Sequence, residues 1–200
     1  MKLIAALAAC ACIPAHAEDP VWEFNVTGYW NSPKGDDGYA SGIAIASRGA
    51  LHLEARANYE AIHAQSLFIG WTFEAGDEVK LEARPIVGLV GHSLRGGIVG
   101  FEASISGRRK WDYYIEVERV NSRTQGTDDY TYAWSELGWR PLEALRLGIV
   151  GQRTRIHGSD HDYLGGGLVQ YTHGKFTVGA YWFNPGSSDQ VVIVSLGAAF

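Results

Sequence analysis

The chain has 200 residues, enough for one domain, and its 22 acidic side chains outnumber the 17 lysines and arginines, giving a formal net charge of −5. This balance excludes the basic patch expected of a nucleic-acid-binding protein. No run of about 20 apolar residues follows the N-terminal segment, which excludes a helical membrane protein. The 25 glycines and the frequent aromatic residues are typical of many strands joined by tight turns.

The N-terminal segment has the pattern of a secretory signal peptide. Lys2 supplies the positive charge, residues 3–13 form a short apolar run, and residues 15–17 (AHA) fit an A-x-A cleavage site. The run is too short to cross a bilayer as a helix. We therefore expect a signal peptide over residues 1–17 and a single mature domain over residues 18–200.

Both cysteines, Cys10 and Cys12, lie inside this predicted signal, so the mature chain has no thiol for a disulfide or a cysteine metal site. A second interpretation takes residues 7–10 (LAAC) as a lipoprotein box. We rank it lower because it leaves an apolar region of only a few residues. We expect no cofactor and no bound metal.

Further along, apolar and polar residues alternate, which predicts β-strands because successive side chains on a strand point to opposite faces. The clearest case is the segment 51–60, where Leu51 and Leu53 alternate with Glu54 and Arg56. Twelve such segments cover, in chain order, residues 21–30, 39–46, 51–60, 66–73, 81–89, 101–105, 111–118, 130–139, 145–152, 163–172, 176–183 and 191–200.

The spacing of these segments predicts a membrane-crossing barrel. A tilted transmembrane strand needs roughly 9–11 residues, and barrel strands are even in number. Every second connection, counted from the first, tends to be the longer and more polar one, as outer loops are over short periplasmic turns. Ten strands is the nearest alternative. Pro85 removes a hydrogen-bond donor from its strand, so we expect a bulge there.

The final segment, 191–200, has apolar residues at alternate positions down to Phe200. An apolar strand of this kind needs a partner, and closure against the first strand supplies one. A strand that ends in Phe200 resembles the closing strand of Gram-negative outer-membrane β-barrels. The fold class that we predict is all-β: a closed, antiparallel, up-and-down transmembrane barrel of about twelve strands, located in the outer membrane.

Alternation alone does not decide which face points outward, because a soluble barrel or sandwich would bury the leucines and expose the charges. Three observations favour lipid outside: the export signal with the absent cysteines, tryptophans near segment ends, as an interfacial girdle requires, and apolar positions that are often alanine or β-branched, which suit fluid lipid better than a tightly packed core. The charged face then lines the lumen. The predicted lumen-lining residues are Glu54, Arg56, Glu82, Arg84, Glu102, Glu116, Glu118, Glu136 and Arg146.

Two interpretations of this charged interior remain open. Either the ion pairs fill and stiffen the barrel, or they line a narrow hydrated passage whose excess of acids favours cations or polar neutral solutes. We favour the passage, because twelve strands enclose more space than the eight that side chains alone can fill. In size and architecture the chain is similar to the small monomeric porins for oligosaccharides, although its acidic balance departs from their basic linings.

Enzymatic chemistry is a second hypothesis. A serine, a histidine and a carboxylate meeting at the rim could form a hydrolase, and the candidate residues are His92, Ser93, His161 and Asp162. Small outer-membrane barrels include lipid A deacylases, acyltransferases and phospholipases. The deacylase-like His-x-Ser-Asn pattern is absent, however, because His92 adjoins Ser93 directly. We favour a function without catalysis over an enzyme, and a plugged structural or adhesive barrel is the third hypothesis.

The predicted partners are membrane components. We expect contact with outer-membrane lipid and lipopolysaccharide, whose phosphates the segment 153–155 (RTR) could bind, and with the barrel assembly machinery through Phe200. We expect no nucleic-acid partner.

Overall fold

A computed structural model describes residues 20–107, 110–157 and 161–200 of the chain. The predicted signal peptide lies outside the described residues. Within those ranges no helix is long and apolar enough to cross a membrane.

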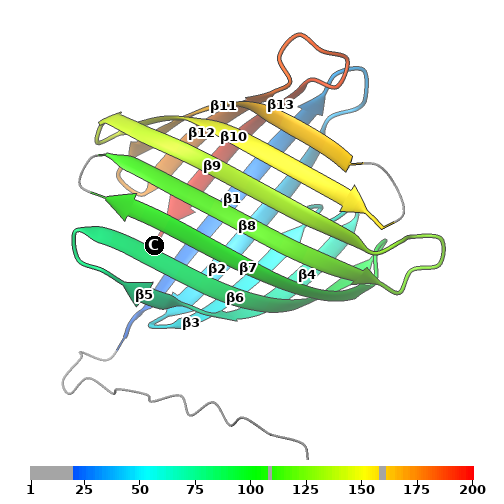
Figure 1. Ribbon diagram of the computed structural model, residues 1–200, viewed down its shortest axis with the longest axis horizontal. Helices are drawn as coiled ribbons and strands as arrows, with labels where there is room; N and C mark the ends of the chain where they lie inside the picture. The colour runs from blue at the N-terminus through cyan, green and yellow to red at the C-terminus, as the bar shows by residue number, and fades with distance from the viewer. Residues whose placement is uncertain (1–19, 108–109, 158–160) are drawn as a thin grey trace, which may run out of the picture.

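The described chain forms one continuous antiparallel sheet that closes on itself (Figure 1). Each strand pairs with its neighbours in sequence, β13 pairs with β1, and the pairing of β4 with β6 completes the wall. The strands are β1 (Trp22–Pro33), β2 (Tyr39–Arg48), β3 (Leu51–Ala57), β4 (Ala64–Trp71), β5 (Phe73–Ala75), β6 (Val79–His92), β7 (Gly96–Gly107), β8 (Trp111–Ser122), β9 (Tyr130–Leu142), β10 (Leu145–Ile156), β11 (His161–His173), β12 (Phe176–Phe183) and β13 (Val191–Ala199).

The short strand β5 continues β4 after a break at Thr72. Both segments pair with β6 in one register, since Gly70 lies opposite Ile86 and Phe73 lies opposite Ala83. The break faces Pro85, which has no N–H to donate to this side of the ladder. The barrel therefore has twelve strands, as predicted, and the ten-strand alternative is wrong. Our expectation of a bulge at Pro85 is also wrong: the partner strand is interrupted instead, and β6 pairs with β7 without a shift.

Long and short connections alternate around the barrel, as the sequence predicts. The longer loops include 34–38, 58–63, 123–129 and 184–190, and they all lie at one end of the barrel. The opposite end has tight turns such as 49–50 and 174–175. Gly49 and Gly174 each open a two-residue turn with φ of 57°, a left-handed conformation that glycine adopts without a steric penalty.

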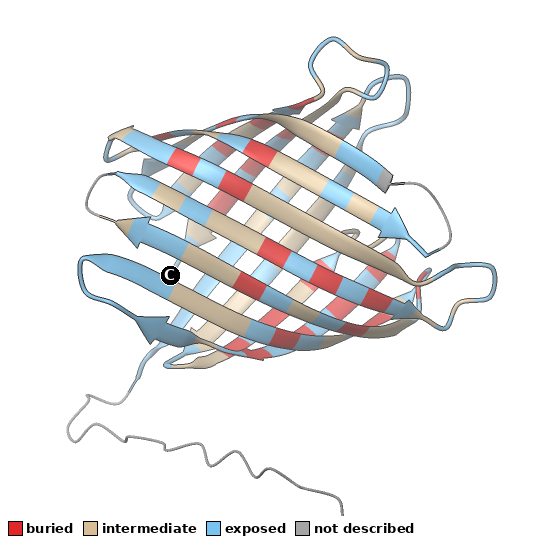
Figure 2. Cartoon of the chain, viewed as in Figure 1, coloured by how far each residue is buried: buried red, intermediate tan, exposed pale blue. Residues whose placement is uncertain are grey.

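The two faces of the sheet are oriented as the membrane interpretation requires. Leu67 and Leu89 on the outer face are 68% and 72% exposed, whereas Glu54 and Glu118 on the inner face are only 5% and 2% exposed. Buried and exposed residues alternate along β6, β7 and β8 (Figure 2). An exterior of this composition suits acyl chains and not water, so the prediction about sidedness is confirmed.

Exposed tryptophans mark both ends of this apolar exterior. Near the short turns lie Trp22, Trp71, and the stacked pair Trp111 and Trp139, whose ring centroids are 6.1 Å apart. Near the loops, Trp182 is exposed. Such girdles sit at the two membrane interfaces of transmembrane barrels.

A charged substitution at mid-height of the outer face tests this orientation. We expect Ile69→Arg to lower the free energy of unfolding by about 2–4 kcal/mol, because the guanidinium would enter the hydrocarbon layer. The measurement is denaturant unfolding of the barrel folded into lipid vesicles. Asp37→Arg in the exposed 34–38 loop is the control and should leave stability unchanged. Equal effects of the two substitutions would contradict a lipid-facing position for Ile69.

Candidate functional site: the barrel interior

The guanidinium of Arg56 lies at the centre of the largest group of interior charges. Arg56 projects inward from β3 and is 3% exposed. Its Nε bonds Glu54 on the same strand, and its Nη1 lies 3.0 Å from both Glu116 and Glu118 on β8. Glu60 follows at 3.6 Å and Glu102 at 4.0 Å. One cation thus faces five carboxylates drawn from β3, β7, β8 and the 58–63 loop.

Aromatic rings fix the plane of this guanidinium. The ring of Phe68 lies 4.3 Å from the Arg56 Cζ, and the ring of Tyr59 lies 4.7 Å from it. Both distances are within the range of a cation–π contact, which is strongest where water is excluded. Phe68 itself packs in an apolar cluster that covers the interior wall of β4, β6, β7 and β8, and this cluster includes Ile86 and Val120.

The carboxylates around Arg56 are only partly satisfied. Within the described part of the chain, neither carboxylate oxygen of Glu60 has a hydrogen-bond partner, and the same is true of Glu116 Oε1 and Glu118 Oε1. Arg84 neutralises Glu102 through a 2.6 Å bond, but Arg84 does not reach the others. Buried carboxylates normally find donors or counter-ions. Around Arg56, acidic side chains therefore outnumber basic ones.

A second ion-pair network lies toward the short-turn end of the barrel. Arg146 on β10 contacts Asp112 and Glu136, each at 2.5 Å, and Arg140 also pairs with Asp112. The network extends through Gln170, whose amide accepts from Arg146 at 3.0 Å and donates to the Tyr181 hydroxyl at 2.9 Å. Here two arginines face two carboxylates, so the charges balance and the ion pairs stabilise the barrel wall.

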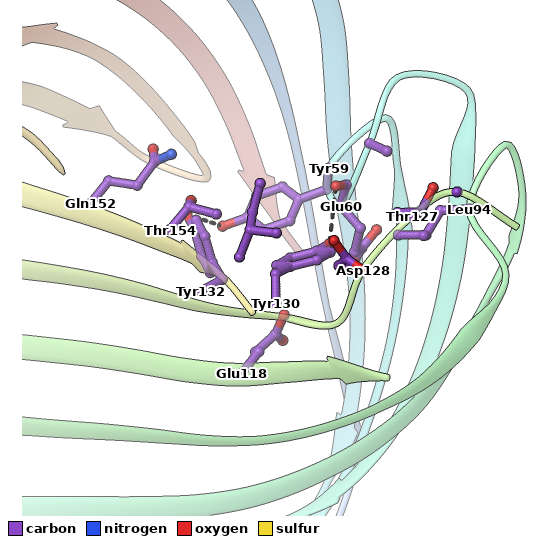
Figure 3. Close-up of a pocket in the computed structure, with 13 residues that line it drawn as sticks. Tyr59, Glu60, Leu94, Glu118, Thr127, Asp128, Tyr130, Tyr132, Gln152 and Thr154 are labelled. Atoms are coloured by element: carbon purple, nitrogen blue, oxygen red, sulfur yellow. Dashed lines mark hydrogen bonds between the residues drawn. The ribbon is translucent and has the colours of Figure 1, made fainter. Parts of the chain in front are cut away.

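Three cavities follow one another along the interior. The outer cavity, of about 480 Å³, lies behind the long loops and contains Leu94 and Asp128 in its wall (Figure 3). The middle cavity, of about 390 Å³, contains the Arg56 cluster. The third, of about 210 Å³, opens between Lys175 and Thr177 at the short-turn end. The outer and middle cavities share Tyr59, Tyr132 and Gln152, and the middle and third share Asn25, Thr27, Tyr29 and Tyr181.

All nine residues predicted to line the lumen lie on the inner face of their strands, but they do not share one space. Glu54, Arg56, Glu102, Glu116 and Glu136 border the middle cavity. The remaining four are distributed elsewhere: Glu118 borders the outer cavity, Glu82 and Arg84 border a shallow hollow beside Glu102, and Arg146 is buried in the second ion-pair network.

The candidate catalytic residues are not brought together. His92 ends β6 and is exposed, and the Ser93 hydroxyl donates to the backbone carbonyl of Ile62 at 2.7 Å. His161 and Asp162 begin β11, and strands β7 to β10 separate them from β6. A Ser–His–carboxylate site requires these groups within hydrogen-bond reach of one another, and the strand order places the two pairs on separate parts of the wall.

One buried trio has the composition of a metal site. Ligand-type atoms of His52, Glu54 and Glu102 lie within 4.8 Å of one another. Glu54 is already bonded to His52 and to Arg56, and Glu102 is bonded to Arg84. The two guanidinium groups supply the positive charge that a metal ion would bring, so charge balance does not require a metal here.

The predicted set of lumen-lining residues contains no aromatic residue, although several aromatic side chains line the interior. Tyr29, Tyr59, Tyr132, Trp134 and Tyr181 border the middle cavity. A signal for most of them was present, because Tyr132 and Trp134 alternate in phase with Glu136 on one strand, and residues in phase share a face.

No protein-family model matches the sequence, and no curated protein matches it. Solved structures do resemble the fold. A KdgM porin superposes with a TM-score of 0.65 at 9% identity, covering 88% of this chain and 99% of the porin. A structure of KdgM porin in complex with disordered oligogalacturonate gives 0.61 at 6% identity, with 88% and 98% covered. NanC porin gives 0.55 at 7% identity, with 88% and 98% covered. The protein therefore has the fold of the small outer-membrane porins.

The dependence of the interior on one guanidinium can be measured directly. We expect Arg56→Met to cost roughly 3–5 kcal/mol of unfolding free energy, because it leaves buried carboxylates without their counter-charge. Adding Glu116→Gln and Glu118→Gln should recover part of the loss. Arg84→Met, which removes a half-buried guanidinium with one carboxylate partner, is the matched control and should cost less. Denaturant unfolding measures the stability of wild type, Arg56→Met, the triple variant with both glutamine substitutions, and Arg84→Met. A triple variant no more stable than Arg56→Met would refute the charge argument.

Proposed function

We propose that the protein is an outer-membrane channel that admits small polar solutes through a narrow lumen and favours cations. The observation that carries this proposal is the series of three interior cavities with shared walls, which runs from the loop end of the barrel to the short-turn end. The porin fold and the apolar exterior support a location in the outer membrane.

The charges along this route support a preference for cations. Among the described residues, two basic side chains, Arg56 and Lys175, border the three cavities. Seven carboxylates border them, namely Glu54, Glu60, Glu102, Glu116, Glu118, Asp128 and Glu136. Rings of acidic side chains attract cations and repel anions in a confined pore. An acidic oligosaccharide such as the oligogalacturonate named for one structural neighbour is therefore an unfavourable solute for this interior.

The shared walls define the narrow points. Tyr59 and Tyr132 approach each other across the interior, with their hydroxyl oxygens 3.4 Å apart, where the outer cavity meets the middle one. The rings approach edge to face, with centroids 6.1 Å apart. These two rings therefore narrow the interior where the outer and middle cavities meet. The proposed passage is thus selective by size as well as by charge.

Planar-bilayer recording tests the channel. We expect discrete conductance steps, a reversal potential in a KCl gradient that indicates preference for K⁺, and a weaker preference in Glu116→Gln, because one lining carboxylate is lost. Glu143→Gln in the short turn 143–144 removes the same charge away from the cavities and should behave as wild type. A correctly folded barrel that passes no current would reject the channel and favour the plugged structural barrel.

We further propose that the rim beside β8 to β10 contacts lipopolysaccharide. Arg119 and Arg155 are exposed on the outer face near the loops, and both lie opposite Thr131 in adjacent strand pairs. Together with His157 they border a shallow pocket. Guanidinium groups bind phosphate through paired hydrogen bonds. We also propose that the barrel assembly machinery recognises the chain through Phe200.

The proposed lipid contact predicts that removing arginines at the rim lowers the retention of lipopolysaccharide, whereas removing an arginine at the short-turn end does not. We expect a double variant, Arg119→Ser with Arg155→Ser, to retain less lipopolysaccharide on extraction than wild type, because two phosphate ligands are lost. Arg48→Ser is the control, since Arg48 is also exposed on β2 but lies at the short-turn end. Quantifying lipopolysaccharide phosphate per purified barrel gives the answer, and equal retention in all three proteins would argue against the proposal.

A further inference from the structure

The outer cavity has features that a passage for hydrated ions alone does not need. The cavity has a volume of about 480 Å³, which is the size of a small-molecule pocket, and it lies directly behind the loops (Figure 3). Its wall combines carboxylates, tyrosine rings and aliphatic groups with the neutral polar side chains of Thr127, Gln152 and Thr154. Each kind restricts what the cavity will bind.

The charge in the wall is negative. Glu60, Glu118 and Asp128 border the cavity, and its described lining contains no lysine, arginine or histidine. The side chains of Glu60 and Glu118 are both 2% exposed. Both oxygens of Glu60, and Oε1 of Glu118, lack a hydrogen-bond partner among the described residues. The nearest cation, Arg56 Nη1, is 3.6 Å from Glu60 and is shared with Glu116 and Glu118. The cavity therefore has unsatisfied acceptors for a positively charged donor.

The rest of the wall is aromatic and aliphatic apart from the neutral polar side chains of Thr127, Gln152 and Thr154. Tyr59, Tyr130 and Tyr132 converge on the cavity (Figure 3), and Leu94 and Ile156 add aliphatic surface. The Tyr130 hydroxyl donates to the Glu60 backbone carbonyl at 3.1 Å and so fixes the loop that carries the carboxylate. Tyrosine faces attract cations, and apolar surface stabilises a hydrocarbon body.

We propose that this cavity is a binding site for organic amines, in which the ammonium group donates to Glu60 and Glu118 and the hydrocarbon body lies against the tyrosines. A bare inorganic ion would use the carboxylates but not the apolar wall, whereas a neutral polar solute would use neither fully. The inference rests on the proposed channel by naming a solute class for it. The binding itself does not require an open pore.

Calorimetric titration of the folded barrel in detergent micelles tests the site with phenethylammonium as the probe. The neutral 2-phenylethanol and the anionic phenylacetate carry the same ring and report partition into micelles or apolar surface. We expect saturable binding of the amine alone, and at least tenfold weaker binding in Glu60→Gln and in Glu118→Gln. Glu143→Gln removes one carboxylate at the opposite end and should bind as wild type.

Each result has one meaning. Binding of 2-phenylethanol as tight as that of the amine, or unchanged affinity in both glutamine variants, would overturn the amine site. The shift in gel mobility between unheated and boiled samples shows that each variant is folded, and the wild-type comparison of the three probes stands even if a variant is not. Amine binding by a barrel that conducts no current rejects the channel and keeps the site, while current without amine binding rejects the site and keeps the channel.

Discussion

The attraction between the Arg56 guanidinium and the carboxylates around it is the interaction on which the interior depends. Desolvating one cation and five acids is costly, and it is tolerated only because they are close together. The cluster connects β3 to β7 and β8 over the inner face of β4 and β6, so it also ties this part of the wall together. Because the acids around Arg56 outnumber it, the same contacts that stiffen the barrel leave some carboxylate oxygens without a hydrogen-bond partner among the described residues.

Glycines make room for this arrangement. Gly88 lies beneath Phe68, and a Cβ atom at Gly88 would collide with the Phe68 ring. Gly100 stands in the same relation to Ile86, with the added atom 2.9 Å away. Any larger residue would push Phe68 off the Arg56 guanidinium or toward the lumen. The high glycine content therefore does more than form turns, because it sets how far aromatic side chains fill the interior.

The fold could be predicted from the sequence because its signals are local. Alternation such as that of Leu53 with Glu54 gives both the strand and the face that meets lipid, and the connection lengths give the up-and-down order. The interior could be predicted only as a set of charges. Which acids meet Arg56 depends on pairing across the lumen between β3 and β8, and strand periodicity contains no information about distances across a barrel. Glu60 shows the limit most clearly, because its position depends on the 58–63 loop folding inward.

The fold follows from local sequence patterns, whereas the contacts inside the barrel do not. For this reason the function has to be argued from the residues of the inner face and not from the fold. The likeness to porins at 9% identity or less fixes the shape of the wall but not the residues that line it. At the short-turn end Arg140 and Arg146 are matched by Asp112 and Glu136. At the loop end, beside three tyrosines, neither carboxylate oxygen of Glu60 has a hydrogen-bond partner among the described residues, and Glu118 Oε1 has only the ion pair with Arg56. In the channel that we propose, a cation entering from the loops would meet the carboxylates of the outer cavity first and the balanced ion-pair network afterwards.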